Sequence, residues 1–343
     1  MKRLLNTLFV TSEDVYLSLQ EENVVAQKDK KIISRYPLHT LQNIVSFSYM
    51  GASPALMGAC AERDIGLSFC TPQGRFQARV VGLRHGNILL RKEQYRISEN
   101  PECSCLIARN MIFGKLYNAK WSLQRAIRDH RDRLNLPVIQ NSINIITDQM
   151  HNAKDETDLE RLRGIEGVGA SAYFGTFDEL ILRNKECFFF QKRSRRPPLD
   201  AVNAMLSFTY SILANECASA LEAVGLDSYS GFLHRDKPGR KSLSLDIMEE
   251  LRTCLADRFV ITLINNRVID SDDFDKMETG AVLLNNLGRK KFLKAWQERK
   301  TDTIVHPFLQ EKIQWGMVPY VQALLLARYF RGDLDGYPPF LWK

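Results

Sequence analysis

Three separate stretches of the chain contain residues that could together bind one metal ion. Glu166 lies among small residues, His234 precedes a basic loop, and Asp246 and Glu249 stand three residues apart further along. Carboxylate oxygens and one imidazole nitrogen, as in Glu166, His234 and Glu249, form a donor set that suits Mg²⁺ or Mn²⁺ better than zinc or iron. Such an ion can polarise a phosphodiester and stabilise the attacking or leaving oxygen. The set therefore predicts metal-dependent phosphodiester chemistry without a nucleophilic side chain.

The same patterns have ordinary structural interpretations, which the sequence leaves open. Glu166 could be solvent-facing, with Tyr173 two helical turns later on the same face. Single histidines are more often structural than metal-bound, but a histidine in a basic loop before an acidic helix, such as His234, is not expected in the core. Asp246 and Glu249 could form a solvated surface, and either of them could be the ligand.

The helix expected over residues 243–259 places the two acids on one side. Its apolar residues recur at helical spacing and form a stripe: Ile247, Leu251, Cys254, Leu255 and Phe259. At 100° per residue, Asp246 and Glu249 lie about 60° apart and away from this stripe. Arg252 stands one turn after Glu249, where it could hold a phosphate or pair with the carboxylate. We therefore expect both acids to lie off the core face.

Basic clusters indicate where a polyanion would bind. One run lies between the metal-binding segments: Lys192, Arg193, Arg195 and Arg196. A second occupies residues 289–294. Such residues contact nucleic-acid phosphates, and binding through them weakens steeply with salt. Either run could equally be solvated surface. Tyr210 could stack on a base, but we expect it to pack in the core.

The chain divides into a β-rich first part and a helical second part. The first contains short alternating or β-branched runs and one helix that Ser53 would cap and Pro54 would begin. In the second, apolar spacings of three and four predict helices over 103–134, 139–151, 155–163, 166–184, 198–224, 243–259, 289–299 and 308–331. We expect an α+β fold with a small N-terminal β-rich domain, 1–95, and a larger all-α C-terminal domain, 96–343.

Composition restricts the class of protein only mildly. The 343 residues include 47 Lys and Arg against 40 Asp and Glu, a net charge of +7, which permits a polyanionic partner without requiring one. Seven scattered cysteines favour a reduced, cytoplasmic protein over a disulfide framework. No stretch approaches the ~18 consecutive apolar residues of a membrane helix, so no membrane association is expected. A P-loop motif is absent from the sequence.

Four ordered boxes resemble the motifs of the CRISPR-associated spacer-acquisition endonuclease and integrase family. The boxes are Glu166-Gly167 with Tyr173-Phe174, Arg196-Pro197-Pro198 through Tyr210, Gly231-x-x-His234, and Ser242-Leu243-x-Leu245-Asp246-x-Met248-Glu249-x-x-Arg252. They span residues 164–252, and the β-then-α division extends the likeness over nearly the whole chain. The closing Tyr-Pro-Pro-Phe-Leu-Trp segment, 337–342, resembles the type I-C branch.

Carried over residue by residue, the resemblance implies roles for individual side chains. The catalytic metal ligands would be Glu166, His234 and Glu249. Their supporting neighbours would be Asp246 and Tyr173, with Asp246 remaining a rival ligand. The expected DNA contacts are Lys192, Arg193, Arg195, Arg196, Lys237 and Arg252.

The resemblance also implies an activity and partners. The 3′-hydroxyl of a captured DNA fragment would attack a phosphodiester of a CRISPR array, with Mg²⁺ or Mn²⁺ activating that hydroxyl, in an antiviral adaptation process. The expected partners are double-stranded DNA, a second copy of the chain joined through the β domain, and a small ferredoxin-like protein bridging two dimers. A branched-DNA nuclease of repair and a non-catalytic DNA-binding scaffold remain alternatives.

Overall fold

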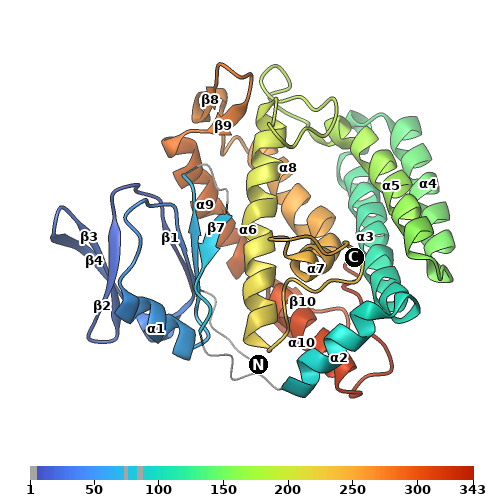
Figure 1. The fold of residues 1–343 in the computed structure, drawn as a ribbon. Helices are drawn as coiled ribbons and strands as arrows, with labels where there is room; N and C mark the ends of the chain where they lie inside the picture. Colours follow the sequence, from blue (N-terminus) through green and yellow to red (C-terminus); the bar gives the residue numbers. More distant parts are fainter. Residues whose placement is uncertain (1–5, 73–75, 83–87) are drawn as a thin grey trace.

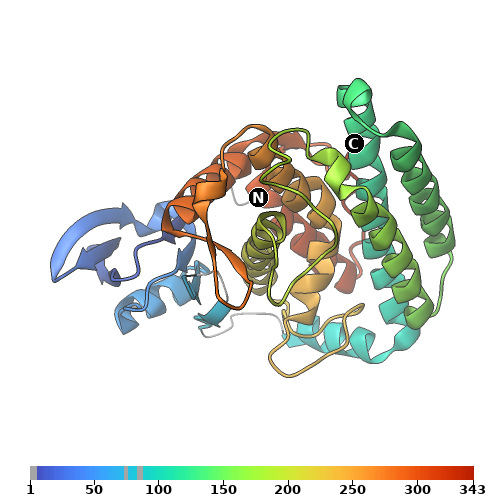
Figure 2. The same cartoon turned by 90° about the horizontal axis from the view of Figure 1, so that it is seen from above.

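The computed structural model describes residues 6–72, 76–82 and 88–343, and it has strands in the N-terminal part and mostly helices afterwards. This order confirms the predicted fold class. Figures 1 and 2 show the N-terminal strands at one end of the molecule and helices α3 (Pro101–His130), α4 (Leu136–Lys154) and α5 (Leu159–Gly175) at the other. Helix α6 (Ala201–Ala223) lies between them.

The N-terminal part contains two sheets. The antiparallel sheet has the order β2-β3-β4: β2 (Tyr16–Gln20), β3 (Asn23–Lys28) and β4 (Lys31–Pro37). The mixed sheet has the order β1-β5-β6-β7: β1 (Asn6–Val10), β5 (Leu41–Ser46), β6 (Gly66–Cys70) and β7 (Phe76–Arg79). In each of the two hairpin turns of the antiparallel sheet, two residues have positive φ. Two-residue turns with this conformation match the right-handed twist of the strands they connect.

One helix packs on these strands, as the sequence predicted. Helix α1 (Pro54–Glu62) begins after Ser53, whose hydroxyl accepts a hydrogen bond from the Leu56 N–H at 3.2 Å. Leu56 is fully buried together with Leu17 and Ile44 in a small core of this region.

The C-terminal part is helical, with additions that the sequence did not predict. Its further helices are α2 (Ile88–Glu99), α7 (Ser242–Leu251), α8 (Arg258–Asn265), α9 (Asn286–Thr301) and α10 (Val318–Phe330). Two short antiparallel pairs interrupt them: β8 (Phe274–Lys276) with β9 (Val282–Leu284), and β10 (Thr303–Val305) with β11 (Lys312–Gln314). Three-residue strands are too short to give an alternating pattern, which explains why they were missed.

Three predicted helix ranges are wrong. The helix expected over 308–331 begins only at Val318, and residues 312–314 form strand β11 instead. The helices expected over 155–163 and 166–184 are one helix, α5, which Asp158 caps by accepting hydrogen bonds from two N–H groups. Its glycines do not end it, because packing compensates their low helix propensity. The helix expected over 243–259 is α7 and α8 joined by a π-helical segment, Arg252–Asp257. A π segment leaves no clear sequence signal.

A large core joins the two parts of the chain. It includes Val45 and Phe47 from the strand region together with residues of most of the helices. The Phe47 ring lies 6.0 Å from that of Phe208 on α6. Helix α2 begins at Ile88, before residue 95, and Gln94 donates hydrogen bonds to the backbone oxygens of Asp227 and Ser230 at 2.8 and 2.9 Å. This helix therefore packs on the helical part.

The last residues of the chain cross helices α3 and α7 without regular secondary structure. Phe340 is fully buried; its N–H donates to Glu250 Oε2 at 2.7 Å, and its carbonyl accepts from Asn118 Nδ2 at 2.8 Å. Asn118 Nδ2 also donates to the Glu250 carbonyl oxygen at 2.8 Å. The closing segment, 337–342, is thus part of the helical core. Among the described residues, no helix combines the length and apolar character that a bilayer span requires.

Candidate metal centre

The predicted metal ligands come together where helices α3, α5 and α7 meet. Glu166 lies in α5, Glu249 in α7, and His234 in the loop before α7. Close packing of α5 on α3 depends on Gly169, where a Cβ atom would lie 2.2 Å from Leu116 Cδ2. The small residues after Glu166 therefore bring α5 near α3, as their composition suggested.

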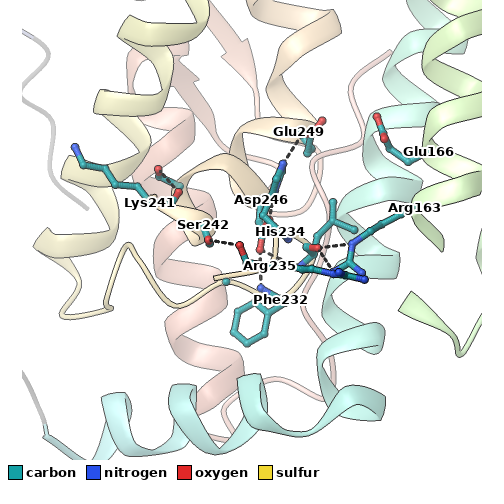
Figure 3. A network of polar contacts seen from close by, with 12 residues as sticks. Arg163, Glu166, Phe232, His234, Arg235, Lys241, Ser242, Asp246 and Glu249 are labelled. Carbon is teal, nitrogen blue, oxygen red and sulfur yellow. Dashed lines mark hydrogen bonds and ion pairs between the residues drawn. The ribbon is translucent and has the colours of Figure 1, made fainter. Parts of the chain in front are cut away.

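Asp246 holds the loop that carries His234. It is fully buried, and its Oδ2 accepts hydrogen bonds from the N–H groups of Phe232 and Leu233 at 2.7 and 3.0 Å. Its Oδ1 accepts from the His234 N–H at 3.0 Å and lies 2.5 Å from His234 Nδ1 (Figure 3). Gly231 permits this arrangement, because a Cβ there would lie 2.8 Å from Asp246 Oδ2. Both carboxylate oxygens of Asp246 are thus engaged by protein donors.

These contacts fix the orientation of the His234 ring. A carboxylate accepts hydrogen bonds, so we assign the ring proton to Nδ1 and the free lone pair to Nε2. Nε2 lies 3.8 Å from Glu249 Oε1 (Figure 3). The ring therefore directs its free nitrogen toward Glu249. A carboxylate that accepts the other ring N–H orients metal-binding histidines in the same way.

Glu249 is buried among positive groups. Its side chain is 3% exposed, and its Oε1 lies 2.9 Å from Arg252 Nη1. Its Oε2 lies 2.8 Å from Lys115 Nζ, a residue of α3 that also donates a hydrogen bond to Glu166 Oε1. Burial alone would raise the pKa of Glu249, but the charges of Arg252 and Lys115 outweigh burial and lower it to about 2. The carboxylate is therefore ionised at any physiological pH.

The burial of both acids differs from the prediction. Asp246 and Glu249 are fully or almost fully buried, whereas the helical spacing placed them off the core face. Helix α7 is enclosed on nearly every side, because α3, α6 and α10 and the closing segment surround it. The predicted apolar stripe is buried as well. A helix buried all round offers no polar face, so the amphipathic interpretation was wrong here.

The three predicted ligands do not yet form a closed metal cluster. Among the described residues, no group of three His, Cys, Asp or Glu side chains is close enough to hold a metal ion. Lys115 explains this spacing, because its ammonium stands between the carboxylates of Glu166 and Glu249. The donor set nevertheless fits a hard cation: two carboxylates, and an imidazole nitrogen with a free lone pair.

A cavity of 420 Å³ opens beside Glu166 and Lys115. Tyr173 and Tyr210 line it, and Tyr210 donates a hydrogen bond to Asp257 at 2.5 Å. Burial raises the pKa of Asp257 to about 6 and that of both tyrosines well above the usual range. Tyr173 is buried in an aromatic cluster with Phe174 and Phe177, whereas Tyr210 lies between core and cavity.

Guanidinium groups line the same cavity. Arg193 and Arg252 lie on the Tyr210 ring, with their Cζ atoms 5.4 and 5.2 Å from its centroid. Arg193 is half-buried and donates to Asn203 Oδ1 at 2.7 Å and Ser207 Oγ at 3.0 Å. The Nε atoms of both arginines are buried and have no hydrogen-bond partner among the described residues. Because both residues line the cavity, they give this wall positive charge.

The other predicted DNA contacts lie at the surface. Lys192, Arg195 and Arg196 are exposed, and the first two also line the cavity. Lys237 is exposed in the loop after His234. Half of the second basic run is engaged within the protein: Arg289 is buried and donates to the Pro72 carbonyl, and Lys291 pairs with Asp273 at 2.9 Å. Lys290 and Lys294 are exposed.

Comparison with known proteins places the chain in a family. The family described as CRISPR associated protein Cas1 matches residues 8–298. A CRISPR-associated endonuclease Cas1 from Chlorobaculum tepidum is 46% identical over 343 residues, all of both chains, and one from Rhodospirillum rubrum is 48% identical over 349 residues, again all of both chains. The chain belongs to the Cas1 family. The predicted family is confirmed. The relatives are named endonucleases, which supports the prediction that the protein is an enzyme. These matches do not decide the type I-C branch.

Solved Cas1-like structures share the fold. A casposase bound to integration product has a TM-score of 0.83 at 21% identity, covering 98% of this chain and 94% of its own. A Cas1 protein from Thermotoga maritima has a TM-score of 0.81 at 21% identity, covering 95% and 97%. At this identity the likeness concerns the fold, and it agrees with the β-then-α order predicted from the sequence.

Sequence reasoning missed Lys115 entirely. It lies 51 positions before Glu166 in a helix whose residues showed no ligand-like spacing. A lysine that is 8% exposed can be recognised only when its carboxylate partners are seen in space. Asp257 was missed as well, because the π-helical segment turns it toward Tyr210 in a way that regular helical spacing does not predict.

Proposed function

We propose that this Cas1-family protein is a divalent-metal-dependent DNA endonuclease and integrase, which inserts new spacer DNA into a CRISPR array. The reaction would be attack of a DNA 3′-hydroxyl on a phosphodiester. The observation that carries the proposal is the convergence of Glu166, Glu249 and the free Nε2 of His234 beside a cavity lined by arginines. The names of its relatives agree with an endonuclease.

Glu166, His234 and Glu249 would hold the metal ion, and Mg²⁺ or Mn²⁺ fits their donors. When bound, such an ion supplies Lewis-acid stabilisation of the attacking and leaving oxygens. Asp246 keeps the proton of His234 on Nδ1 and so keeps Nε2 available. We propose that Asp246 is a positioning residue rather than a ligand, since protein donors already engage both of its oxygens.

The cavity would receive the phosphate at the reacting end of the DNA. Arg193 and Arg252 line the cavity, and their guanidinium groups would attract an anionic oxygen there. The exposed Lys192, Arg195, Arg196 and Lys237 would contact the DNA backbone further away. The phosphate would thus lie directly beside the carboxylates that hold the metal.

Partners follow from the same proposal. Solved relatives include a Cas1–Cas2 complex within a larger assembly and a DNA-bound casposase. We propose double-stranded DNA and a CRISPR-associated partner for this chain, the latter a small ferredoxin-like protein that bridges two homodimers. Residues 1–95 would serve dimerisation and 96–343 catalysis. The resemblance of the closing segment, 337–342, supports a type I-C member.

A strand-transfer assay tests the proposal. A labelled duplex with free 3′ ends is incubated with a supercoiled repeat plasmid, Mn²⁺ and the protein, with and without the bridging partner. Glu166→Ala, His234→Ala and Glu249→Ala should abolish joining, while Glu298→Ala, an exposed acid on α9, should not. Joining retained by any two of the three would refute the metal centre. Cleavage without joining would favour the branched-DNA nuclease, and inactivity even with the partner would favour the scaffold.

A further inference from the structure

Lys115 occupies the position between the two carboxylates of the candidate metal centre. Its Nζ donates to Glu166 Oε1 and lies 2.8 Å from Glu249 Oε2. The Lys115 side chain is 8% exposed, and that of Glu249 is 3% exposed. Taking an ammonium group out of water is costly, and the two carboxylates offset that cost. The three side chains come from α3, α5 and α7, so the lysine joins three helices at one point.

The charges allow one cation to replace the other. Glu166 and Glu249 together carry two negative charges, and a divalent ion between them would neutralise both. An ammonium remaining at the same place would then be an uncompensated positive charge beside the metal, and the two cations would repel each other.

The contacts also show which positive group can leave. Arg252 pairs with the other oxygen of Glu249, Oε1, and is held against the Tyr210 ring. Lys115 pairs with Oε2, lies at the wall of the 420 Å³ cavity, and has a flexible four-carbon stem. Movement of the ammonium into the cavity would free one oxygen on each carboxylate without disturbing Arg252.

We propose that Lys115 is the built-in counter-cation of the metal centre. It holds Glu166 and Glu249 together before a divalent ion binds, and it competes with that ion for the same oxygens. Lys115 is therefore a positioning residue that stabilises the metal-free centre and lowers its affinity for metal. This inference rests on the proposed function, because it takes Glu166 and Glu249 as the metal ligands.

The test measures metal affinity, which does not depend on catalysis. Mn²⁺ binding to the full-length protein is measured by the loss of the electron paramagnetic resonance signal of free Mn²⁺. Lys115→Met should bind Mn²⁺ at least about tenfold more tightly than wild type, because no charge competes. Lys115→Arg should bind more weakly than wild type, because a guanidinium is always charged and can hold both carboxylates at once. Lys120→Met is the matched control, since it removes the same charge from the same helix.

Thermal unfolding gives a second readout. Without metal, Lys115→Met should melt below wild type, because two carboxylates then face each other without a cation between them. Saturating Mn²⁺ should raise its melting temperature by more than it raises that of wild type. If Lys115→Met proves too unstable to study, the weakened Mn²⁺ affinity expected of Lys115→Arg remains a sufficient test.

The possible results separate this inference from the proposed function. Suppose that the wild-type protein binds Mn²⁺ and Glu166→Ala does not. Unchanged or weaker Mn²⁺ binding by Lys115→Met would then overturn the role of Lys115 alone. Affinity for Mn²⁺ in Lys115→Arg equal to or above that of wild type would do the same. Wild-type protein that binds no Mn²⁺ would overturn the proposed metal centre itself, and this inference with it.

Discussion

Replacing Asp246 by Asn tests whether a buried carboxylate sets the state of His234. The Asp246 side chain accepts four hydrogen bonds, three from backbone N–H groups of residues 232–234 and one from His234 Nδ1. An Asn side chain has one acceptor oxygen, which can keep the bonds to Phe232 and Leu233. Its NH₂ group then faces the His234 N–H and Nδ1.

The cost of Asp246→Asn follows from these contacts. Two hydrogen bonds to a charged acceptor are lost, at about 1.5–3 kcal/mol each. Movement of the ring proton to Nε2 would restore one bond, because Nδ1 could then accept from the amide. We therefore expect a loss of about 2–4 kcal/mol in the free energy of unfolding. The same proton shift removes the lone pair that faces Glu249, so Mn²⁺ affinity should fall about 10- to 100-fold.

Urea unfolding and Mn²⁺ binding measure the two effects on the same protein. Asp236→Asn is the matched control, because Asp236 is exposed in the same loop and accepts a long hydrogen bond, 3.4 Å, from the Gly231 N–H. An Asp246→Asn variant within about 0.5 kcal/mol of wild type would refute the account of the buried carboxylate, since surface substitutions change stability by no more than that. Unchanged Mn²⁺ affinity in a destabilised variant would refute the assigned tautomer. Binding lost as completely as in Glu249→Ala would instead make Asp246 a ligand.

Three further predictions concern other parts of the structure. Burial raises the pKa of Glu250 to about 8, whereas its ordinary pKa is 4.5. Between pH 4.5 and 8 the folded protein therefore keeps a proton that the unfolded chain has released. The free energy of unfolding should fall over this range as pH rises, by up to about 1.4 kcal/mol per pH unit. Glu250→Gln should remove that slope in urea unfolding at pH 5.5 and 8, and parallel curves would contradict it. Gly231→Ala should lower the free energy of unfolding by about 1–3 kcal/mol, because its Cβ would lie 2.9 Å from the Ser242 carbonyl carbon. Gly164→Ala, where nothing lies within 4 Å of the added Cβ, should instead stabilise α5 by up to about 1 kcal/mol. Equal melting temperatures of the two variants would refute both expectations. Lys192→Ala with Arg195→Ala should weaken duplex binding and reduce the salt slope of log K by about 0.9 per lost phosphate contact; an unchanged slope would place the DNA elsewhere.

The β-then-α order of the chain could be predicted from the sequence, which also singled out Glu166, His234 and Glu249 as candidates for the site. Strand alternation and helical spacing are local, so the β-then-α order was recoverable. The partnership of Glu166 with Glu249 came from a resemblance, and the structure brings them to the same ammonium. Lys115 could not be predicted, because its role depends on the packing of α3 against α5 and α7. Burial of Asp246 was missed because amphipathic analysis assumes that a helix has one solvent-facing side.

The neighbouring acids of α7 show how one helix serves both the site and the fold. Glu249 meets Lys115 and Arg252, and its pKa is lowered to about 2, whereas Glu250 meets Gln322 and the Phe340 N–H, and its pKa is raised to about 8. Both are buried, so the presence or absence of positive partners decides which one carries charge. The neutral acid binds the closing segment, and Asn118 of α3 binds both that segment and α7. Because Lys115 lies one turn before Asn118 on the same helix, the packing that fixes the C-terminal end of the chain also fixes the distance between Lys115 and Glu249.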